Sequence, residues 1–374
     1  MSEPTADGAG GVTLFLCGDV MTGRGVDQIL RHPSRHELRE PYVRDAREYV
    51  QLAEARNGQI SKPVSDSYIW GDALEELDRI RPAARIINLE TSVTTADDYW
   101  RGKQIHYRMH PKNAGCLTAA RIDVCVLSNN HVLDFGDAGL LDTLEALGSA
   151  ELKVAGAGRH LSLAQRPAVV HLKDRNVIVF GVGSETSGIF TSWAASDDKP
   201  GVHLLPDLSE KTAASFVERV LRVRHQHDIV VASIHWGSNW GYDVPRDQVR
   251  FAHWLIDGGV DVIHGHSSHH PRPIEVYRNR LILYGCGDFL NDYEGIQGYE
   301  EYRGDLAVMY FPSFFAATGE LTSLVMRPLQ IRKVRLTTAS AEDTAWVRTK
   351  LDRISASYGC RVDLAADGTL RLRR

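Results

Sequence analysis

The sequence lacks several features that would assign it to a class at once. No apolar run approaches the roughly 18 residues that a membrane-spanning helix needs. Residues 1–11 are small and polar and have neither the charged nor the apolar region of a secretory signal. Basic residues are not in excess, since 43 Lys and Arg oppose 48 Asp and Glu, whereas nucleic-acid binding usually needs a basic patch. We therefore expect a cytoplasmic protein whose partners include neither nucleic acid nor a membrane.

Cysteine is scarce as well, and this bears on redox state and metal binding. The five cysteines form an odd set without C-x-x-C spacing, so buried reduced thiols explain them better than disulfides or a zinc site. A nucleophile elbow, a phosphate-binding loop and a dinucleotide fingerprint are also absent, because Gly181-Val182-Gly183 lacks the third glycine and the helix start. Common nucleophilic and nucleotide-binding classes are thus disfavoured.

What the sequence does contain is a regular alternation of strand-like and helix-like segments. Short runs rich in β-branched residues are separated by stretches with apolar residues at three- and four-residue spacing, which indicates an α/β fold with strands covered on both faces by helices. The predicted strands are Val12–Cys17, Arg85–Leu89, Asp123–Leu127, Val177–Val182, Ile229–Ile234, Val260–Ile263 and Leu281–Tyr284. The predicted helices are Asp72–Arg81, Asp137–Leu147, Leu208–Arg224 and Arg246–Asp257.

The same patterns predict how the chain is divided. We expect a flexible tail over 1–11, a main domain over 12–335, and an extension over 336–374 with a helix and a hairpin that turns at Asp367-Gly368. A charged insertion over about 32–70, with a helix at His36–Asn57, is expected to stand over the core as a solvated decoration or as a lid.

Polar residues of metal-binding types follow six of the predicted strands. Each has an ordinary explanation on its own, for example a helix cap for Asp or a satisfied core position for His. In open α/β sheets, however, ligands bind beyond the carboxyl ends of the strands, and burying many titratable groups together is costly unless a cation compensates them. We therefore predict a metal site at these strand ends, where the candidates are Asp19, Asn88, Glu90, Asn129-Asn130-His131, His235, the histidines of 264–270 and Asp288.

The predicted ligand types restrict the metal. No cysteine is placed to take part, and a mixture of carboxylate, amide oxygen and imidazole suits hard and borderline cations. We expect one divalent ion, Ca, Mn or Mg before Zn or Fe.

Six motifs in this order resemble the CapA family of capsule biosynthesis, which belongs among the calcineurin-like metallophosphoesterase folds. The resemblance covers about residues 12–310 and implies a two-sheet α/β sandwich flanked by helices, with 12–335 as the catalytic domain and the metal at the strand ends. The motifs are G-D-V-M-T-G-R (18–24), I-N-L-E-T (87–91), L-S-N-N-H-V-L-D-F-G (127–136), I-H-W-G (234–237), G-H-S-S-H-H-P (265–271) and Y-G-C-G-D-F (284–289).

The chain also departs from the two-metal pattern of that fold. Asp19 is followed by Val20 and Met21, so the histidine of the first motif is missing, and two positions after His266 stands Ser268 rather than histidine. The bridging position corresponds to Asn88 or Glu90. The resemblance thus implies Asp19, Glu90, Asn130, His235 and His266 as the metal ligands. A single metal is the better expectation, and ordinary phosphoester hydrolysis is less favoured.

Four further residues are then free for acid–base work. His131 with Asp134, and an imidazole of the 264–270 run with Asp288, are predicted to form two His/Asp couples in which the carboxylate orients the ring, and His269 is the candidate in that run. Two such bases are what an epimerase needs, and the peptide epimerase of lasso-peptide biosynthesis, which inverts the Cα of a C-terminal tryptophan, resembles a member of the same branch. A metal-dependent peptide epimerase is therefore the leading hypothesis. The alternatives are a metal-dependent hydrolase or factor in poly-γ-glutamate or related phosphate, ester or amide metabolism, and a non-catalytic binding module.

The expected partner is a peptide or peptide-like substrate with a free carboxylate. Arg24, Arg101, Lys103 and Arg108 are candidates to hold that carboxylate. Trp236 and Trp240 are candidates to pack against a substrate side chain, with core packing as the equal alternative.

Overall fold

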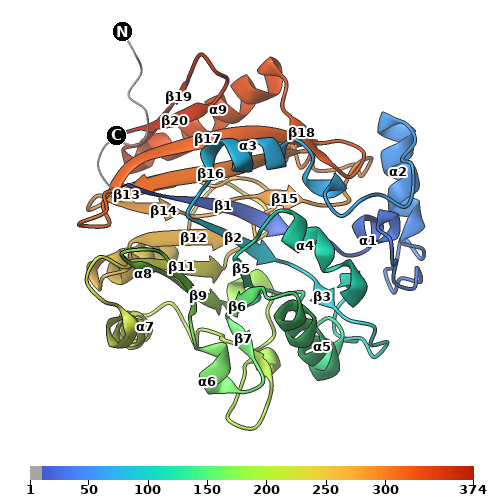
Figure 1. Ribbon diagram of the computed structural model, residues 1–374, viewed down its shortest axis with the longest axis horizontal. Coiled ribbons are helices and arrows are strands. Elements are labelled where there is room, and N and C mark those ends of the chain that lie inside the picture. Colours follow the sequence, from blue (N-terminus) through green and yellow to red (C-terminus); the bar gives the residue numbers. More distant parts are fainter. Residues whose placement is uncertain (1–10) are drawn as a thin grey trace.

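The computed structural model describes residues 11–374 and has two β-sheets packed face to face with helices on both outer sides (Figure 1). The larger sheet has ten strands in the order β19-β20-β17-β16-β1-β2-β5-β6, with β15 paired to β1 and β18 paired to β17. The other has six strands in the order β13-β14-β12-β11-β9-β8. The layered α/β sandwich predicted from the sequence is confirmed. The predicted tail lies outside the described residues except for Gly11.

The strands of the ten-stranded sheet are β1 (Val12–Val20), β2 (Ala84–Leu89), β5 (Val124–Val126), β6 (Lys153–Ala155), β15 (Asp288–Leu290), β16 (Leu306–Phe314), β17 (Leu321–Ile331), β18 (Leu336–Thr338), β19 (Arg361–Leu364) and β20 (Leu370–Arg373). Those of the six-stranded sheet are β8 (Ala168–His171), β9 (Asn176–Gly183), β11 (Ile229–His235), β12 (Val262–His266), β13 (Ile274–Tyr277) and β14 (Arg280–Leu283). Two short pairs are β3 (Ser92–Val93) with β4 (Arg108–Met109) and β7 (Ala157–Gly158) with β10 (Gly201–Val202).

The α-helices are α1 (Gly25–Ile29), α2 (Arg47–Asn57), α3 (Ala73–Ile80), α4 (Gly115–Ala119), α5 (Gly136–Ser149), α6 (Leu161–Ala164), α7 (Glu210–Val223), α8 (Arg246–Asp257) and α9 (Ala341–Ser355). Among residues 11–374 no helix combines the length and the apolar composition required to cross a bilayer.

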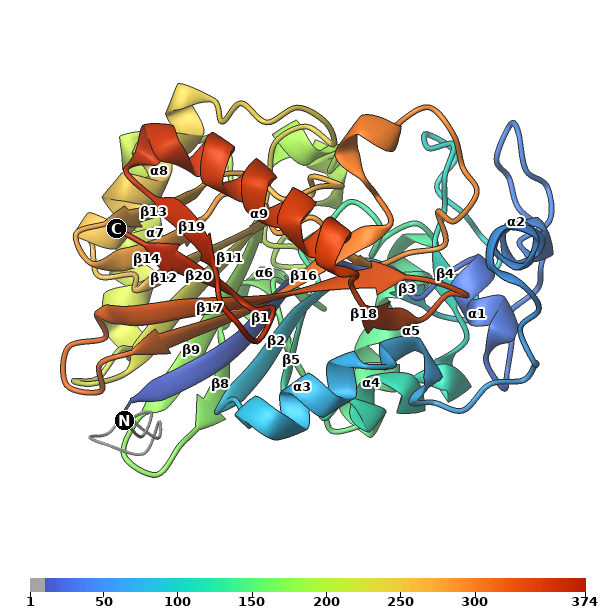
Figure 2. The same ribbon diagram turned by 90° about the horizontal axis from the view of Figure 1, so that it is seen from above.

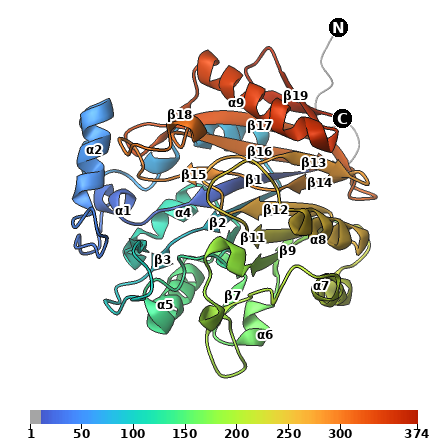
Figure 3. The same ribbon diagram turned by 180° about the vertical axis from the view of Figure 1, so that it is seen from behind.

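The side-chain alternation of β1 explains why this strand sits between two apolar layers. Leu14 and Leu16 belong to the cluster between the two sheets, whereas Phe15 and Cys17 belong to the cluster that the helices α3, α4 and α5 cover. A strand that is apolar on both faces is buried on both faces. On the far side, α7 and α8 cover the outer face of the six-stranded sheet (Figure 3).

All seven predicted strands are present, with bounds that move by at most three residues. The main difference concerns the strand ends. Strand β1 continues to Val20, and β11 and β12 continue to His235 and His266. Asp19 and these two histidines therefore lie on the strands themselves rather than in the loops that follow, with the register of β1 shifting at Asp19.

The predicted helix over His36–Asn57 is shorter in the structure, where only α2 is helical. The preceding segment turns back on itself, with hydrogen bonds from Leu38 N to Arg44 O and from Ala46 N to His36 O at 2.8 Å each. Pro41 lies inside this turn and lacks the N–H that a helix would need. Figures 1 and 3 both place α2 at the edge of the molecule, away from α7 and α8.

The C-terminal segment continues the ten-stranded sheet. The hairpin β19–β20 turns at Asp367-Gly368 as the sequence predicts and adds to β17, and β18 pairs with the other end of β17. Helix α9 lies across these strands (Figure 2) and sends Val347 and Leu351 into the cluster between the sheets.

We expect Leu351→Ala to lower the free energy of unfolding by about 2–5 kcal/mol, because Leu351 is wholly buried and its loss leaves a cavity. Urea denaturation followed by circular dichroism measures the change. Leu364→Ala is the matched control, since Leu364 is 50% exposed at the end of β19, and it should shift the free energy by no more than about 0.5 kcal/mol. Equal midpoints for the two variants would contradict the packing of α9 on the sheets.

Candidate metal centre and acid–base site

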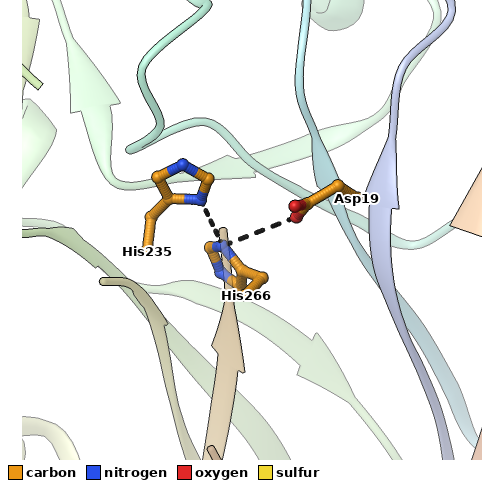
Figure 4. Close-up of side chains that lie close together, drawn as sticks. All are labelled: Asp19, His235 and His266. Carbon is orange, nitrogen blue, oxygen red and sulfur yellow. Dashed lines mark hydrogen bonds and ion pairs between the residues drawn. The ribbon is translucent and has the colours of Figure 1, made fainter. Parts of the chain in front are cut away.

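Three buried side chains from the two sheets converge at one rim of the sandwich. Asp19 comes from β1, and His235 and His266 are paired neighbours on the parallel strands β11 and β12. One ligand atom of each lies within 4.8 Å of the others, and all three side chains are inaccessible to solvent (Figure 4). The sequence prediction placed these three residues in one metal site, and the fold brings them together.

A close backbone approach positions Asp19. A Cβ on Gly18 would lie 1.6 Å from the carbonyl oxygen of Gly287, so only glycine lets β1 approach the segment before β15 this closely. Asp19 N then donates to Gly287 O at 2.9 Å. In the same register, Asp19 lies beside Asn88 of β2 on one side and beside Asp288 of β15 on the other.

The donor set of this cluster fits a divalent cation. His235 Nδ1 and His266 Nδ1 face each other at 2.8 Å, and His266 Nδ1 lies 4.0 Å from Asp19 Oδ1. The other nitrogens are held by polar neighbours, since His266 Nε2 is 2.9 Å from Ser233 Oγ and His235 Nε2 is 3.2 Å from Asn130 Oδ1. Ligating imidazoles are commonly oriented in this way by a partner on the second nitrogen. Asn130 and Ser233 thus border the cluster.

The neighbouring carboxylates increase the negative charge at this rim. Asn88 Nδ2 donates to Asp19 Oδ1 at 2.7 Å and to Glu90 Oε2 at 3.2 Å, so one amide group binds both carboxylates. Burial and then the charge of Asp288 raise the pKa of Asp19 to about 7, and burial and then Asp19 raise the pKa of Glu90 well above its usual range. Burial also lowers the pKa of His235, which keeps this ring neutral, as a metal ligand must be. When ionised, these neighbouring carboxylates repel each other unless a cation compensates their charge.

The first His/Asp couple lies on one side of the cluster, after β5. His131 Nδ1 is 2.6 Å from Asp134 Oδ2, and His131 Nε2 points toward the cluster at 3.8 Å from Glu90 Oε1. Asp134 also accepts from the backbone N–H of Tyr107 at 2.7 Å and from Lys103 Nζ at 2.5 Å. Burial outweighs Asp134 and lowers the pKa of His131 to about 4.

The second couple lies on the other side, next to β15. His269 Nδ1 is 2.9 Å from Asp288 Oδ1, and Asn291 Nδ2 donates to Asp288 Oδ2 at 2.9 Å. Here burial, which lowers the pKa of His269, is outweighed by Asp288 and then Asp19, so the pKa is raised. Asp19, His269 and Asp288 also form a second group of ligand atoms within 4.8 Å.

Two tyrosines connect the couples, and nothing in the strand pattern predicts them. The ring of Tyr107 packs edge-on against His131 at 4.5 Å between centroids, and Tyr293 packs against His269 at 5.7 Å. Their hydroxyl oxygens are 3.1 Å apart. Both residues lie in loops outside the six motifs, and only their positions before β4 and after β15 relate them to the site.

Arg24 does not have the predicted role of holding a substrate carboxylate. Its guanidinium is 2.5 Å from Asp292 Oδ1 and 3.0 Å from Glu40 Oε1, and the residue is 4% exposed. It also lies 4.5 Å from the centroid of Tyr107. Because Glu40 and Asp292 neutralise its charge, Arg24 is a packing partner of Tyr107 rather than a ligand for a substrate carboxylate.

Two other predicted substrate contacts are also corrected. Trp236 is 1% exposed, donates from Nε1 to Tyr284 O at 3.0 Å and belongs to the cluster under α7 and α8, so the core alternative holds. Lys103 is bound to Asp134 and to the carbonyl oxygen of Asn130. The tryptophan at the site is Trp240, whose ring centroid is 5.2 Å from that of His269.

The remaining two candidates for holding a substrate carboxylate are Arg101 and Arg108. Arg101 is exposed in the loop before β4. Arg108 pairs with Asp97 at 2.9 Å and lines a cavity next to the site.

Fold and site together define a class of protein, a two-sheet α/β sandwich with a buried carboxylate–imidazole centre at its strand ends. The family model described as "Bacterial capsule synthesis protein PGA_cap" matches residues 13–293. The chain belongs to this family, and the CapA resemblance of its six motifs is confirmed.

The chain is also similar to several individual proteins. Two Mycobacterium tuberculosis proteins, each described as a probable polyglutamine synthesis accessory protein, are 49% identical over 363 residues, which is 96% of this chain and 96% of theirs. The PGA biosynthesis protein CapA of Bacillus subtilis is 32% identical over 60% of this chain and 56% of its own. Among solved structures, a 5'-nucleotidase precursor from Thermus thermophilus is similar with a TM-score of 0.47 and 16% identity, over 88% of this chain and 55% of that one.

We expect one divalent ion per chain, counted by elemental analysis after dialysis, and a higher melting temperature when Mn²⁺ or Ca²⁺ is added. At a hundredfold excess over Kd, binding stabilises by about 2.7 kcal/mol. Asp19→Asn removes one ligand and also one of the crowded charges, so it should abolish the metal-dependent rise without lowering the melting temperature of the metal-free protein.

His171→Gln is the matched control, because His171 is exposed on the edge strand β8. It should bind the metal as the wild type does. A metal-dependent rise that persists in Asp19→Asn would contradict the assignment of the centre.

Proposed function

We propose that this protein is a metal-dependent enzyme that moves protons at a carbon next to a carboxyl group, as in epimerisation of the C-terminal residue of a peptide. The proposal is carried by the two His/Asp couples on either side of Asp19. The His131–Asp134 couple follows β5, beyond β2, whereas Asp288 of the other couple lies on β15. Inversion of a stereocentre needs one group on each face of the carbon.

Each couple is arranged so that one ring nitrogen is held and the other is available. Nδ1 of His131 and Nδ1 of His269 face Asp134 and Asp288, so the carboxylates fix the orientation of the rings. In the proposed reaction, Nε2 of one histidine takes the proton from Cα. The electron pair left behind spreads onto the adjacent carboxyl group. Nε2 of the other histidine then donates its proton to the opposite face of Cα.

Asp19, His235 and His266 would hold the cation, with Asn130 beside them. When bound, a divalent ion supplies electrostatic stabilisation of the negative charge that develops on the substrate carboxyl group. The protein contributes a site from which water is largely excluded, since the cluster, the first couple and Asp288 are buried and the side chain of His269 is only 12% exposed. In such surroundings each charge interaction is stronger than in water.

One observation favours a second candidate, hydrolysis of a peptide-like amide. The second ligand group, Asp19, His269 and Asp288, would accept a further ion, and paired ions assist hydrolysis by activating water and binding the leaving group. His269 would then be a ligand and no longer an acid or base. The number of bound ions therefore separates the two candidates.

The relatives indicate which substrates to test first. The two mycobacterial proteins are described as accessory to polyglutamine synthesis, so peptides ending in L-glutamine or L-glutamate come before one ending in L-tryptophan. In D₂O, we expect the metal-loaded protein to introduce deuterium at the terminal Cα and to produce the D-isomer. Mass spectrometry and chiral chromatography measure the two outcomes.

His131→Gln and His269→Gln should each lower the rate of isomer formation by about 10²–10⁴-fold, since each removes one proton-transfer group. His171→Gln serves as the control and should react as the wild type does. If new amino termini appear and no deuterium enters the terminal Cα, the reaction is hydrolysis and the epimerase proposal is wrong. Binding without either reaction would reduce the protein to a binding module.

A further inference from the structure

Two buried polar residues lie next to the metal centre without being among its ligands, Ser233 on β11 and His264 on β12. Both side chains are inaccessible to solvent. Side chains two positions apart on a strand point to the same face, so these two residues share a face with His235 and His266, one step back along the paired strands. Burying polar groups costs free energy unless they are hydrogen-bonded, and their hydrogen bonds show what they contribute.

The contacts of His264 determine which of its ring nitrogens carries the proton. Its Nε2 lies 2.7 Å from the carbonyl oxygen of Cys17, and its Nδ1 lies 3.0 Å from Oγ of Ser233. A carbonyl oxygen only accepts, so Nε2 must be the donor. Both partners are uncharged, and burial without a countercharge favours the neutral ring. In the neutral ring Nδ1 is an acceptor, so the hydroxyl of Ser233 donates to it.

The hydroxyl of Ser233 in turn determines the position of the proton on His266. Its single hydrogen is directed at Nδ1 of His264, and its oxygen lies 2.9 Å from Nε2 of His266. The oxygen has only lone pairs left to offer, so Nε2 of His266 must carry a proton and donate it to this hydrogen bond. A ligating histidine is neutral, and Nδ1 of His266 therefore keeps a free lone pair.

This lone pair faces the other two members of the cluster. Nδ1 of His266 is 2.8 Å from Nδ1 of His235 and 4.0 Å from Oδ1 of Asp19, the two contacts marked in Figure 4. In the opposite tautomer a proton would sit on this nitrogen, and it would have to leave before a cation binds. The chain of hydrogen bonds therefore prepares His266 as a ligand before any metal is present.

We propose that Ser233 and His264 are positioning residues of the metal centre, which hold the proton of His266 on Nε2 and keep its Nδ1 open for the cation. The chain begins at the carbonyl oxygen of Cys17 on β1, the strand that also carries Asp19. The proposal rests on the metal centre of the proposed function, but not on the reaction proposed for it. If the two residues only tied the sheets together, their loss would lower stability and leave the proton of His266 where it is.

The proton position is read from the ¹⁵N chemical shifts of the histidine rings in the metal-free full chain, with the signals of His266 identified by their loss in His266→Gln. We expect the proton on Nε2 in the wild type. In Ser233→Ala the oxygen that accepts from Nε2 is absent, so both tautomers should be populated. The dissociation constant for Mn²⁺, measured by titration calorimetry, should rise about 10–100-fold, as is typical when the outer partner of a ligating histidine is removed.

Three further variants separate the chain of hydrogen bonds from packing. His264→Leu has no acceptor for the hydroxyl of Ser233 and should change the shifts of His266 and the Mn²⁺ affinity as Ser233→Ala does. His264→Asn restores an acceptor near the position of Nδ1 and should return both measurements toward the wild type. Ser355→Ala is the matched control, because Ser355 is also wholly buried and its hydroxyl accepts from the backbone N–H of Ile274. It should change neither measurement.

A proton on Nδ1 of His266 in the wild type would overturn the proposal, and so would wild-type shifts in both Ser233→Ala and His264→Leu. Should Ser233→Ala fail to fold, the wild-type spectrum and the two His264 variants still decide. Altered shifts and weaker Mn²⁺ binding in the variants, in a protein that neither exchanges nor cleaves any peptide, would keep the chain of hydrogen bonds and refute the reaction. Unaltered shifts with normal deuterium exchange would refute the chain and keep the reaction.

Discussion

The arrangement of the site depends on several carboxylates that are buried together at the edge where the two sheets meet. Strand register alone places Asp19 next to Asp288, and Glu90 follows on the adjoining strand end. The cations nearby are already used, because Lys103 is bound to Asp134 and Arg24 to Asp292. Like charges in a low dielectric are costly. The central acids therefore retain a demand for positive charge that Lys103 and Arg24 do not meet.

The sequence allowed this centre to be predicted because it depends on a rule of topology. Parallel strands bring their carboxyl ends to one edge, so His235 and His266 could be placed together without knowledge of the tertiary fold. The burial of Trp236 in the core could also have been predicted from the geometry of a strand. Neighbouring residues of an extended chain point to opposite faces, so a histidine in the site directs the next residue into the core.

Other features depend on contacts between distant parts of the chain, which no local pattern contains. Arg24 meets Asp292, 268 positions away, and also Glu40 from the insertion. With these partners it is a support for Tyr107 rather than a substrate contact. The insertion is thereby tied to the acid–base site, since Glu40 reaches it through Arg24. Loops rather than strands bring this layer together, and loops carry the weakest sequence signal.

The second couple decides which chemistry the centre can perform. Nδ1 of His269 and the facing oxygen of Asp288 are 2.9 Å apart and hold each other. His269 and Asp288 are also two of the three residues that could hold a second ion, together with Asp19. A histidine that binds an ion must be neutral and acts as a ligand rather than as an acid or base. A centre with one ion keeps a histidine on each side for proton transfer, and a centre with two ions exchanges one of these histidines for a ligand.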